Sequence, residues 1–252
     1  MFTVGRRVNV RYLKQAIWAC HIASDFLFSG LVSVSANKFA DSLNVPPHFL
    51  VHLFSIEDKR FLIHPEIDPI AIVRAAASNI AGNRLQGAST ITQQLYHARS
   101  QVTGLRRQRT IAQKFRQITW AVYKNACYSK ADILDQYLET VYWGRSYYGV
   151  DAAARGYFNS KRSELSVAQS FFLVERLAKP NSVSLRRIES LLQRPSIALQ
   201  FAMNATAIDE LETLYAKHFN CGGIAWRHSL AKFPTKSDTP IVKFWSDASN
   251  VQ

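Results

Sequence analysis

Two adjacent carboxylic acids, Glu57 and Asp58, lie in the stretch SIEDKRFLIH, which runs from Ser55 to His64. An aromatic residue, Phe61, and the histidine follow them at short spacing. Such a stretch is either an exposed charged turn or one half of an active site. The choice between the two depends on what the rest of the chain places beside it.

A second stretch, RLQGASTITQQL, gathers small residues at positions 87–90. Small residues let a backbone approach a ligand closely, and a helix N-terminus offers free N–H groups to an anion. The plainer interpretation is a capped helix that follows a turn. A third stretch, YWGRSYYGVDAAARGYF, sets glycines among aromatic residues at positions 142–158. It suits either a platform for sugar rings or ordinary core packing.

The composition is that of an ordered globular protein with a large positive charge. The chain has 252 residues, of which 48% are hydrophobic and 19% charged, and its formal net charge is +13. This surplus favours an anionic partner, such as a phosphate, a nucleic acid or an acidic membrane face, without choosing among them. Runs of basic residues ordinarily form solvated faces. They occur at Arg6-Arg7, at Arg106-Arg107 with Arg109, and at Arg186-Arg187.

The sequence predicts no structural zinc site and no disulfide framework. Its three cysteines, Cys20, Cys127 and Cys221, are widely spaced and form no C-x-x-C pair. His48 and His52 stand four apart, but the glutamate of a zinc-protease helix is missing between them.

The N-terminal part has the charge order of a membrane anchor. Residues 14–34 are apolar on average and follow several basic residues. Asp25 falls within the segment, and an aspartate at mid-membrane costs roughly 2.5–3.5 kcal/mol. A spanning helix, a helix on the membrane surface and a helix packed on the domain therefore all stay open.

Most of the remaining chain predicts helices. Capping residues before apolar residues at helical spacing predict helix starts at Asp68, at Ser89 or Thr90, at Ser129 and at Ser166. Another helix is expected over 188–201, interrupted by Pro195, and a last one over 205–218. Few strand patterns occur, and the polar tail after 223 is expected to be loosely held.

Four motifs follow one another along the chain: EDKRF..H, QGASTITQQL, KADILDQYLETVYWGRSYYGVDAAARGYF and LSVAQSFFLVERLAKPN. In order and spacing they resemble the signature motifs of the peptidoglycan glycosyltransferases, glycosyltransferase family 51. This family includes monofunctional wall-synthesis enzymes and the first domain of bifunctional penicillin-binding proteins. The resemblance covers about residues 46–181 and continues more weakly to about 218.

The resemblance implies an all-α, lysozyme-like glycosyltransferase domain over 46–218. A basic N-terminal segment, 1–45, with a weak anchor or surface helix would precede it, and a loosely ordered tail, 219–252, would follow. The implied reaction polymerises lipid II, an undecaprenyl-pyrophosphate-linked disaccharide-peptide. The 4-hydroxyl of the acceptor GlcNAc attacks C1 of the donor and releases undecaprenyl pyrophosphate. This chemistry needs a base on the hydroxyl and positive charge or hydrogen-bond donors at the pyrophosphate.

The implied location is the bacterial cytoplasmic (inner) membrane, with the catalytic domain on its periplasmic or outer face. The implied partners are lipid II, the nascent glycan, the anionic membrane surface and other cell-wall synthesis proteins. No nucleic acid is expected, because no nucleic-acid-binding module is recognisable. No cofactor is firmly implied, although a divalent metal is compatible with the donor pyrophosphate.

By position, Glu57 matches the family's general base, and Asp58 would hold it and the neighbouring backbone in place. A partly desolvated carboxylate beside another carboxylate has a raised pKa, which suits a base near neutral pH. The resemblance also implies a set of substrate-side residues, which are Phe61, His64, Thr90, Gln94, His97, Lys114 and Gln117.

Several motif positions depart from the family pattern. The second motif normally continues Q-Q-L-x-K-N, and here His97 and Ala98 replace the lysine and the asparagine. The third normally reads R-K-x-x-E, and here Gln113 and Gln117 replace the arginine and the glutamate. Each lost donor to the pyrophosphate should cost a factor of about 10²–10³. A protonated His97 could still donate, and Arg109 or Arg116 could substitute.

These departures leave more than one function open. The protein is either a divergent glycosyltransferase with altered donor contacts, or a non-catalytic member that binds lipid II, glycan or a cell-wall synthesis partner. A third, weaker hypothesis is lysozyme-like cleavage with Glu57 as the acid. Such hydrolysis usually requires a second carboxylate, and Gln117 removes the obvious one.

Overall fold

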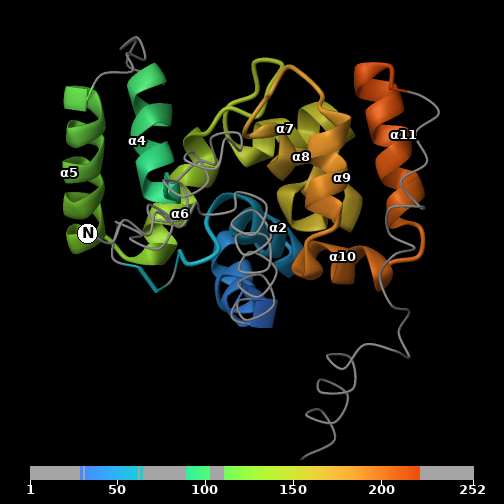
Figure 1. Ribbon diagram of the computed structural model, residues 1–252, viewed down its shortest axis with the longest axis horizontal. Coiled ribbons are helices and arrows are strands. Elements are labelled where there is room, and N and C mark those ends of the chain that lie inside the picture. The colour runs from blue at the N-terminus through green and yellow to red at the C-terminus, as the bar shows by residue number, and fades with distance from the viewer. Residues whose placement is uncertain (1–28, 31, 62, 65–88, 103–110, 222–252) are drawn as a thin grey trace, which may run out of the picture.

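A computed structural model describes residues 29–30, 32–61, 63–64, 89–102 and 111–221 of the chain. Within these residues the protein is built of helices (Figure 1). The extended pairing among them is an isolated antiparallel bridge between Tyr142 and Tyr148. The all-α prediction is therefore confirmed.

A helix over residues 32–43 precedes the labelled elements. These are α2 (Pro47–Glu57), α4 (Ile91–Val102), α5 (Ile111–Cys127), α6 (Lys130–Thr140), α7 (Val150–Phe158), the 3-10 turn η1 (Arg162–Glu164), α8 (Val167–Arg176), α9 (Leu185–Leu192), α10 (Pro195–Ala202) and α11 (Ala207–Phe219).

The predicted helix starts are confirmed where the structure describes them. Ser129 caps α6 and Ser166 caps α8, each in a reciprocal capping box with the residue three positions on. Thr90 caps α4 by accepting a hydrogen bond from the backbone N–H three residues later, at 3.3 Å. Such caps stabilise a helix by about 1 kcal/mol each because they satisfy backbone donors that have no partner within the helix.

Pro195 divides the helix expected over 188–201 as predicted. The helix α9 ends at Leu192, and Pro195 occupies the first turn of α10, where its missing N–H costs no hydrogen bond. The helix predicted at Asp68, the tail after 223 and most of segment 14–34 lie outside the described residues. Of the helices in the described ranges, none has the length and apolar character needed to cross a membrane.

The helices form two groups with α2 between them (Figure 1). In one group, α4 packs against both α5 and α6. In the other, α8 packs against α11, and α10 contacts α8 and α9. The helix α2 packs against α8 and α10, so the second group supports most of its length. Its C-terminal end carries Glu57.

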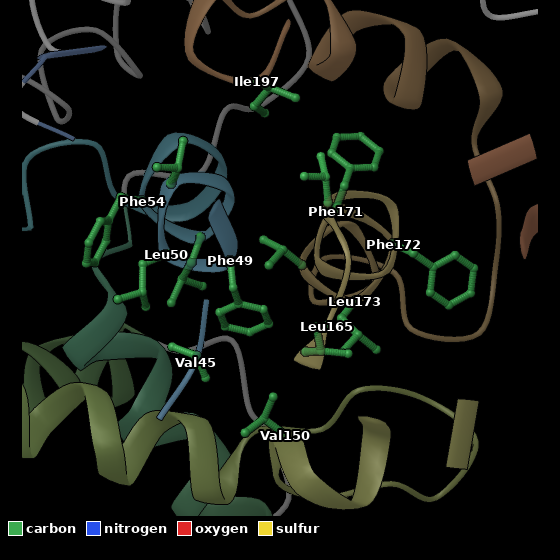
Figure 2. Close-up of a cluster of buried hydrophobic side chains, with 14 of the residues drawn as sticks. Val45, Phe49, Leu50, Phe54, Val150, Leu165, Phe171, Phe172, Leu173 and Ile197 are labelled. Carbon is green, nitrogen blue, oxygen red and sulfur yellow. The ribbon is translucent and has the colours of Figure 1, made fainter. Parts of the chain in front are cut away.

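The core that holds α2 is apolar on nearly every side. Figure 2 shows Phe49 and Leu50 of α2 in the same layer as Phe171 and Leu173 of α8. Every residue of α2 from Phe49 to Ser55 is buried. Residues 32–45 contribute six further apolar side chains to this core, so the helix before α2 packs with the domain. This packing gives Glu57 a rigid support.

Candidate functional site

Glu57 is the last residue of α2 and is half-buried. The side-chain amide of Gln94, on α4, donates a hydrogen bond to Glu57 Oε2 at 2.7 Å. The hydroxyl of Tyr137, on α6, donates to Gln94 Oε1 at 2.9 Å. Because Tyr137 occupies the amide oxygen, the amide nitrogen must point at the carboxylate. Three helices therefore fix the orientation of one carboxyl group.

Asp58 links the end of α2 to the start of α4. Its Oδ1 lies 2.8 Å from His64 Nε2, and its Oδ2 accepts the backbone N–H of Ile91 at 3.1 Å. Asp58 and Thr90 are 7% and 2% exposed, so both act inside the protein. Asp58 thus binds a histidine and the backbone at the start of α4, and its role in holding Glu57 stays a prediction. Thr90 is a helix cap.

Phe61 and His64 are both buried next to Asp58 and α2. Phe61 is 1% exposed and stacks on Phe54 with 5.8 Å between ring centroids. Lys130 places its ammonium 4.5 Å from the centre of the Phe61 ring and donates to the backbone carbonyl of His64 at 3.2 Å. Their described contacts are with the protein, and the substrate contacts assigned to them stay predictions.

Opposing effects act on the pKa of Glu57. Burial raises it, and the hydrogen bond from Gln94 lowers it. The positive charges of Arg187 and Arg194 lower it further, whereas the charge of Asp58 raises it. The pKa stays above its ordinary value, which suits a carboxylate that accepts a proton near neutral pH. Burial and the two carboxylates raise the pKa of Tyr137, so its hydroxyl remains a neutral donor.

Lys114 and Gln117, both on α5, donate hydrogen bonds to Gln93 on α4. Lys114 Nζ donates to Gln93 Oε1 at 2.9 Å and to Ser89 Oγ at 3.4 Å. Gln117 is 1% exposed, and its amide donates to the backbone carbonyl of Gln93 at 2.7 Å. The amide at position 117 is thus a donor to the α4 backbone, which an ionised carboxylate could not be.

His97 lies one turn beyond Gln93 on α4 and is half-buried. Its ring meets the edge of Tyr96, with 5.8 Å between centroids. The structure therefore joins Glu57, Asp58, His64, Thr90 and Gln94 around the ends of α2 and α4. Lys114 and Gln117 of α5 both contact Gln93 of α4. His97 lies one turn further along α4.

Three residues that act on Glu57 or on its partner Gln94 were missed by sequence reasoning: Tyr137, Arg187 and Arg194. Arg194, at the N-cap of α10, donates to the backbone carbonyl of Ser55, and the Ser55 and Ser196 hydroxyls lie 2.7 Å apart. The sequence predicts a solvated face for the Arg186-Arg187 pair, but Arg187 is only partly exposed. A signal was present, because Arg187 stands four residues before the buried Leu191 on one helix face.

The described residues bring no group of three or more His, Cys, Asp or Glu side chains into a metal-binding arrangement. His48 and His52 have other surroundings: His48 Nε2 lies 2.8 Å from the Leu165 carbonyl, and His52 is buried against Phe171 and Phe201. The described residues at the site supply a carboxylate, side-chain amides and cationic side chains.

Comparison with known proteins identifies the family. A family model described as Transglycosylase matches residues 9–202. Penicillin-binding protein 1A of Aquifex aeolicus is 34% identical over 173 residues, which is 68% of this chain and 23% of the relative. Penicillin-binding protein 1A of Rickettsia prowazekii is 35% identical over 145 residues, or 56% of this chain and 18% of the relative.

A third relative, penicillin-binding protein 4 of Bacillus subtilis, is 34% identical over 161 residues, or 63% of this chain and 25% of the relative. The chain thus spans a quarter or less of the length of these three relatives. The helical architecture agrees with the lysozyme-like glycosyltransferase fold that the motifs imply. Since the family model covers most of the chain, the protein belongs to the transglycosylase family.

Proposed function

We propose that this protein is a peptidoglycan glycosyltransferase that polymerises lipid II into glycan strands, with Glu57 as the general base. The observation that carries the proposal is the Gln94–Glu57 hydrogen bond of 2.7 Å at the end of a buried helix. It orients a carboxylate whose pKa is raised by burial. A base needs this combination of fixed direction and proton affinity.

In the reaction, Glu57 accepts the proton of the acceptor GlcNAc 4-hydroxyl as that oxygen bonds to C1 of the donor. The bond between C1 and the pyrophosphate oxygen breaks, and its electron pair leaves with undecaprenyl pyrophosphate. Gln94 binds Oε2 of Glu57, and no hydrogen bond from the described residues reaches Oε1. Oε1 is therefore the oxygen that we assign to the acceptor hydroxyl.

Three further residues support the proposed reaction. Asp58 and the α4 N-terminus keep Gln94 in register with Glu57. Lys114, held by Gln93 and Ser89, supplies a cation for the departing pyrophosphate. A protonated His97, on α4, adds a second donor.

We place the reaction at the outer face of the bacterial cytoplasmic membrane, because the substrate is a membrane lipid. The net charge of +13 favours the anionic lipid surface. The nascent glycan and cell-wall synthesis proteins are the other proposed partners.

The test is polymerisation of labelled lipid II by the full chain. We expect wild type to form glycan strands and Glu57→Gln to form none, because the amide accepts no proton. Glu164→Gln is the matched control, since Glu164 is an exposed carboxylate in a surface ion pair with Lys161. Equal strand formation by wild type and Glu57→Gln would contradict the proposal.

A second candidate function is binding of lipid II or glycan without turnover. It is favoured by Gln117, whose amide serves the backbone of α4 at a position where the family has a glutamate. The same purified protein, titrated with lipid II, separates the two functions. Saturable binding without strand formation supports the second, and strand formation supports the first.

A further inference from the structure

The aromatic turn, residues 142–148, joins α6 to α7 and carries aromatic side chains of two kinds. Some of them belong to the core. Trp143 is fully buried, and the ring of Tyr147 lies 5.2 Å from that of the buried Tyr157. The sequence left open whether the aromatic residues of this stretch pack in the core or bind sugar rings. For Trp143, Tyr147 and Tyr157 the structure supports core packing.

Tyr142 and Tyr148 differ, because they form a ring pair at the surface. Tyr148 is 51% exposed, and its ring centroid lies 5.0 Å from that of Tyr142, with 43° between the ring planes. The backbones of the two tyrosines form the antiparallel bridge at the base of the turn. The hydroxyl of Tyr142 also accepts the backbone N–H of Ser146 at 3.3 Å. The pair is therefore held in place at its backbone and at the outer end of one ring.

The backbone of the aromatic turn is strained. Gly144, Arg145 and Ser146 have φ angles of 94°, 49° and 64° in succession. A residue other than glycine in this left-handed region costs roughly 1–3 kcal/mol and persists only where its surroundings hold it. The guanidinium of Arg145 donates to the backbone carbonyl of His218, on α11, at 2.5 Å and lies 3.2 Å from its Nδ1. Contacts with α11 thus maintain a costly turn that keeps the ring pair together.

Asn181, from the segment between α8 and α9, adds a directed polar group beside the ring pair. Its Oδ1 accepts the hydroxyl of Tyr142 at 3.3 Å and the backbone N–H of Arg145 at 3.4 Å. Because the oxygen faces the turn, the amide nitrogen points away from it. The side chain is exposed, and its N–H groups make no hydrogen bond to any residue that the structure describes. The pair therefore has an aromatic surface with an amide donor at its edge.

We propose that Tyr142, Tyr148 and Asn181 form a binding site for a sugar ring of a glycan strand, separate from the contacts of Glu57. A sugar ring has an apolar face of C–H groups and a rim of hydroxyls. An aromatic surface with a few directed polar groups matches both features. An acyl chain or an apolar helix would instead leave the amide donors without partners. The inference rests on the proposed function in taking the ligand as the glycan that this protein makes.

The chain connects this site to the base over a short distance. Tyr137, on α6, binds Gln94, which in turn binds Glu57. Tyr142 follows Tyr137 by five residues, and five residues span at most about 18 Å. A glycan strand whose end lies at Glu57 therefore needs only a few sugar units to reach the ring pair. A site at this distance holds the grown strand while the next sugars are added.

The experiment measures binding of a sugar chain that carries neither lipid nor peptide. A GlcNAc–MurNAc tetrasaccharide is titrated with the full chain, and the Kd is obtained by ligand-observed NMR. We expect Tyr148→Ala to raise the Kd at least about tenfold, because aromatic anchors carry much of the free energy of binding. Tyr148→Trp should keep the Kd within about threefold of wild type, since the indole also offers a large aromatic face.

The matched control is Tyr123→Ala, which removes another exposed tyrosine, on α5, and should leave the Kd at the wild-type value. Tyr148→Leu keeps an apolar side chain beside Tyr142 without an aromatic face, so it tests the ring if alanine loosens the turn. It should weaken binding as Tyr148→Ala does. The proposal is overturned if wild type shows no saturable binding or if both Tyr148 variants keep the wild-type Kd. An equal loss in Tyr123→Ala also overturns it.

Lipid II polymerisation by the same variants separates this site from the proposed function. Strands from wild type that become shorter in Tyr148→Ala support both, and strands of unchanged length overturn the role of the site in holding the strand. Tetrasaccharide binding that depends on Tyr148, in a protein that never polymerises lipid II, supports the site and counts against the proposed function alone. Strand formation without tetrasaccharide binding supports the proposed function and overturns the site.

Discussion

Side chains from the two groups of helices act on Glu57 in different ways. From α4 comes an amide, Gln94, which acts through a directed hydrogen bond. From α9 and the start of α10 come two guanidinium groups, Arg187 and Arg194, which act on Glu57 through their charge. A hydrogen bond depends steeply on angle and distance, whereas a charge acts over several ångströms. One side therefore directs the carboxylate, and the other lowers its pKa against the larger effect of burial.

The positive charges that act on Glu57 lie on a different side of the site from the one that the sequence motifs indicate. The sequence motifs direct attention to α4 and α5, where glutamines stand at family charge positions. Gln117 of α5 donates a hydrogen bond from its side-chain amide to the backbone carbonyl of Gln93 on α4. The cations that lower the pKa of Glu57, Arg187 and Arg194, come from α9 and from the N-cap of α10, which the motifs did not assign to the site.

The largest expected effect tests the α8–α10 group. Glu175→Ala should destabilise the protein by about 3–5 kcal/mol, because it leaves the fully buried Arg176 without its carboxylate. Urea unfolding of the full chain measures the loss. Glu164→Ala removes an exposed carboxylate and should change the free energy of unfolding by less than about 1 kcal/mol. Equal effects would mean that the buried Glu175–Arg176 pair carries no special stability.

The next effect tests the α4 side. Gln94→Leu should lower lipid II polymerisation about 100-fold with a smaller change in stability, because the carboxylate loses its orienting donor. Losing this bond also removes a contribution that lowers the pKa of Glu57, so the active range should begin at higher pH. A rate profile across pH for both proteins gives the measurement. An unchanged rate would mean that the direction of Glu57 is set elsewhere.

A third prediction concerns the apolar contact of α2 with α8 and α10. Burial lowers the pKa of His52 to about 3, and neither ring nitrogen has a partner among the described residues. In the unfolded chain, His52 binds a proton near its ordinary pKa of 6.5, whereas in the folded protein it stays neutral. The free energy of unfolding therefore falls as pH falls below 6.5. Between pH 7 and pH 5 the loss from His52 should be about 2 kcal/mol.

His52→Leu tests this dependence because leucine does not titrate. The free energies of unfolding of both proteins are measured at pH 7 and pH 5, and the two differences are compared. Other titrating groups contribute equally to both and cancel. Parallel pH dependence in wild type and variant would contradict the depressed pKa.

The smallest expected effect concerns Gln117. It tests whether the glutamine only replaces a catalytically useful glutamate, or whether its amide is needed as a hydrogen-bond donor to α4. Gln117→Glu should destabilise the protein by about 1–2 kcal/mol at neutral pH, since the carboxylate faces the Gln93 carbonyl. The loss should shrink as pH falls, because a protonated carboxyl group can donate again. Thr119→Glu, on an exposed position of the same helix, is the control. Unchanged stability with increased polymerisation would favour the lost charge.

Features that depend on neighbouring positions were predictable from sequence. The capping serines Ser129 and Ser166 act within one helical turn, and both helix starts are confirmed. Asp58 and His64 are six residues apart and do meet. Gln94 could be placed only by the resemblance, because its contact with Glu57 spans 37 residues.

The ion pair between Glu175 and Arg187 could not be predicted in the same way. The two residues are twelve residues apart, on helices whose relative placement depends on tertiary packing. In sequence, a charged residue on a helix is ordinarily assigned to the solvated face, and the Arg186-Arg187 pair was interpreted so. Only one of the two is exposed in the structure.

The bond between Arg194 and the Ser55 carbonyl has a consequence for the helix that carries the base. The aligned peptide dipoles of a helix leave roughly half a negative charge at its C-terminus, which disfavours a carboxylate there. Glu57 stands at that end of α2, and the last turn of α2 contains no basic residue. Arg194 supplies from α10 the cation that α2 lacks. The docking of α10 and the macrodipole of α2 are therefore linked, and a shift of α10 would change the proton affinity of Glu57 without moving α2.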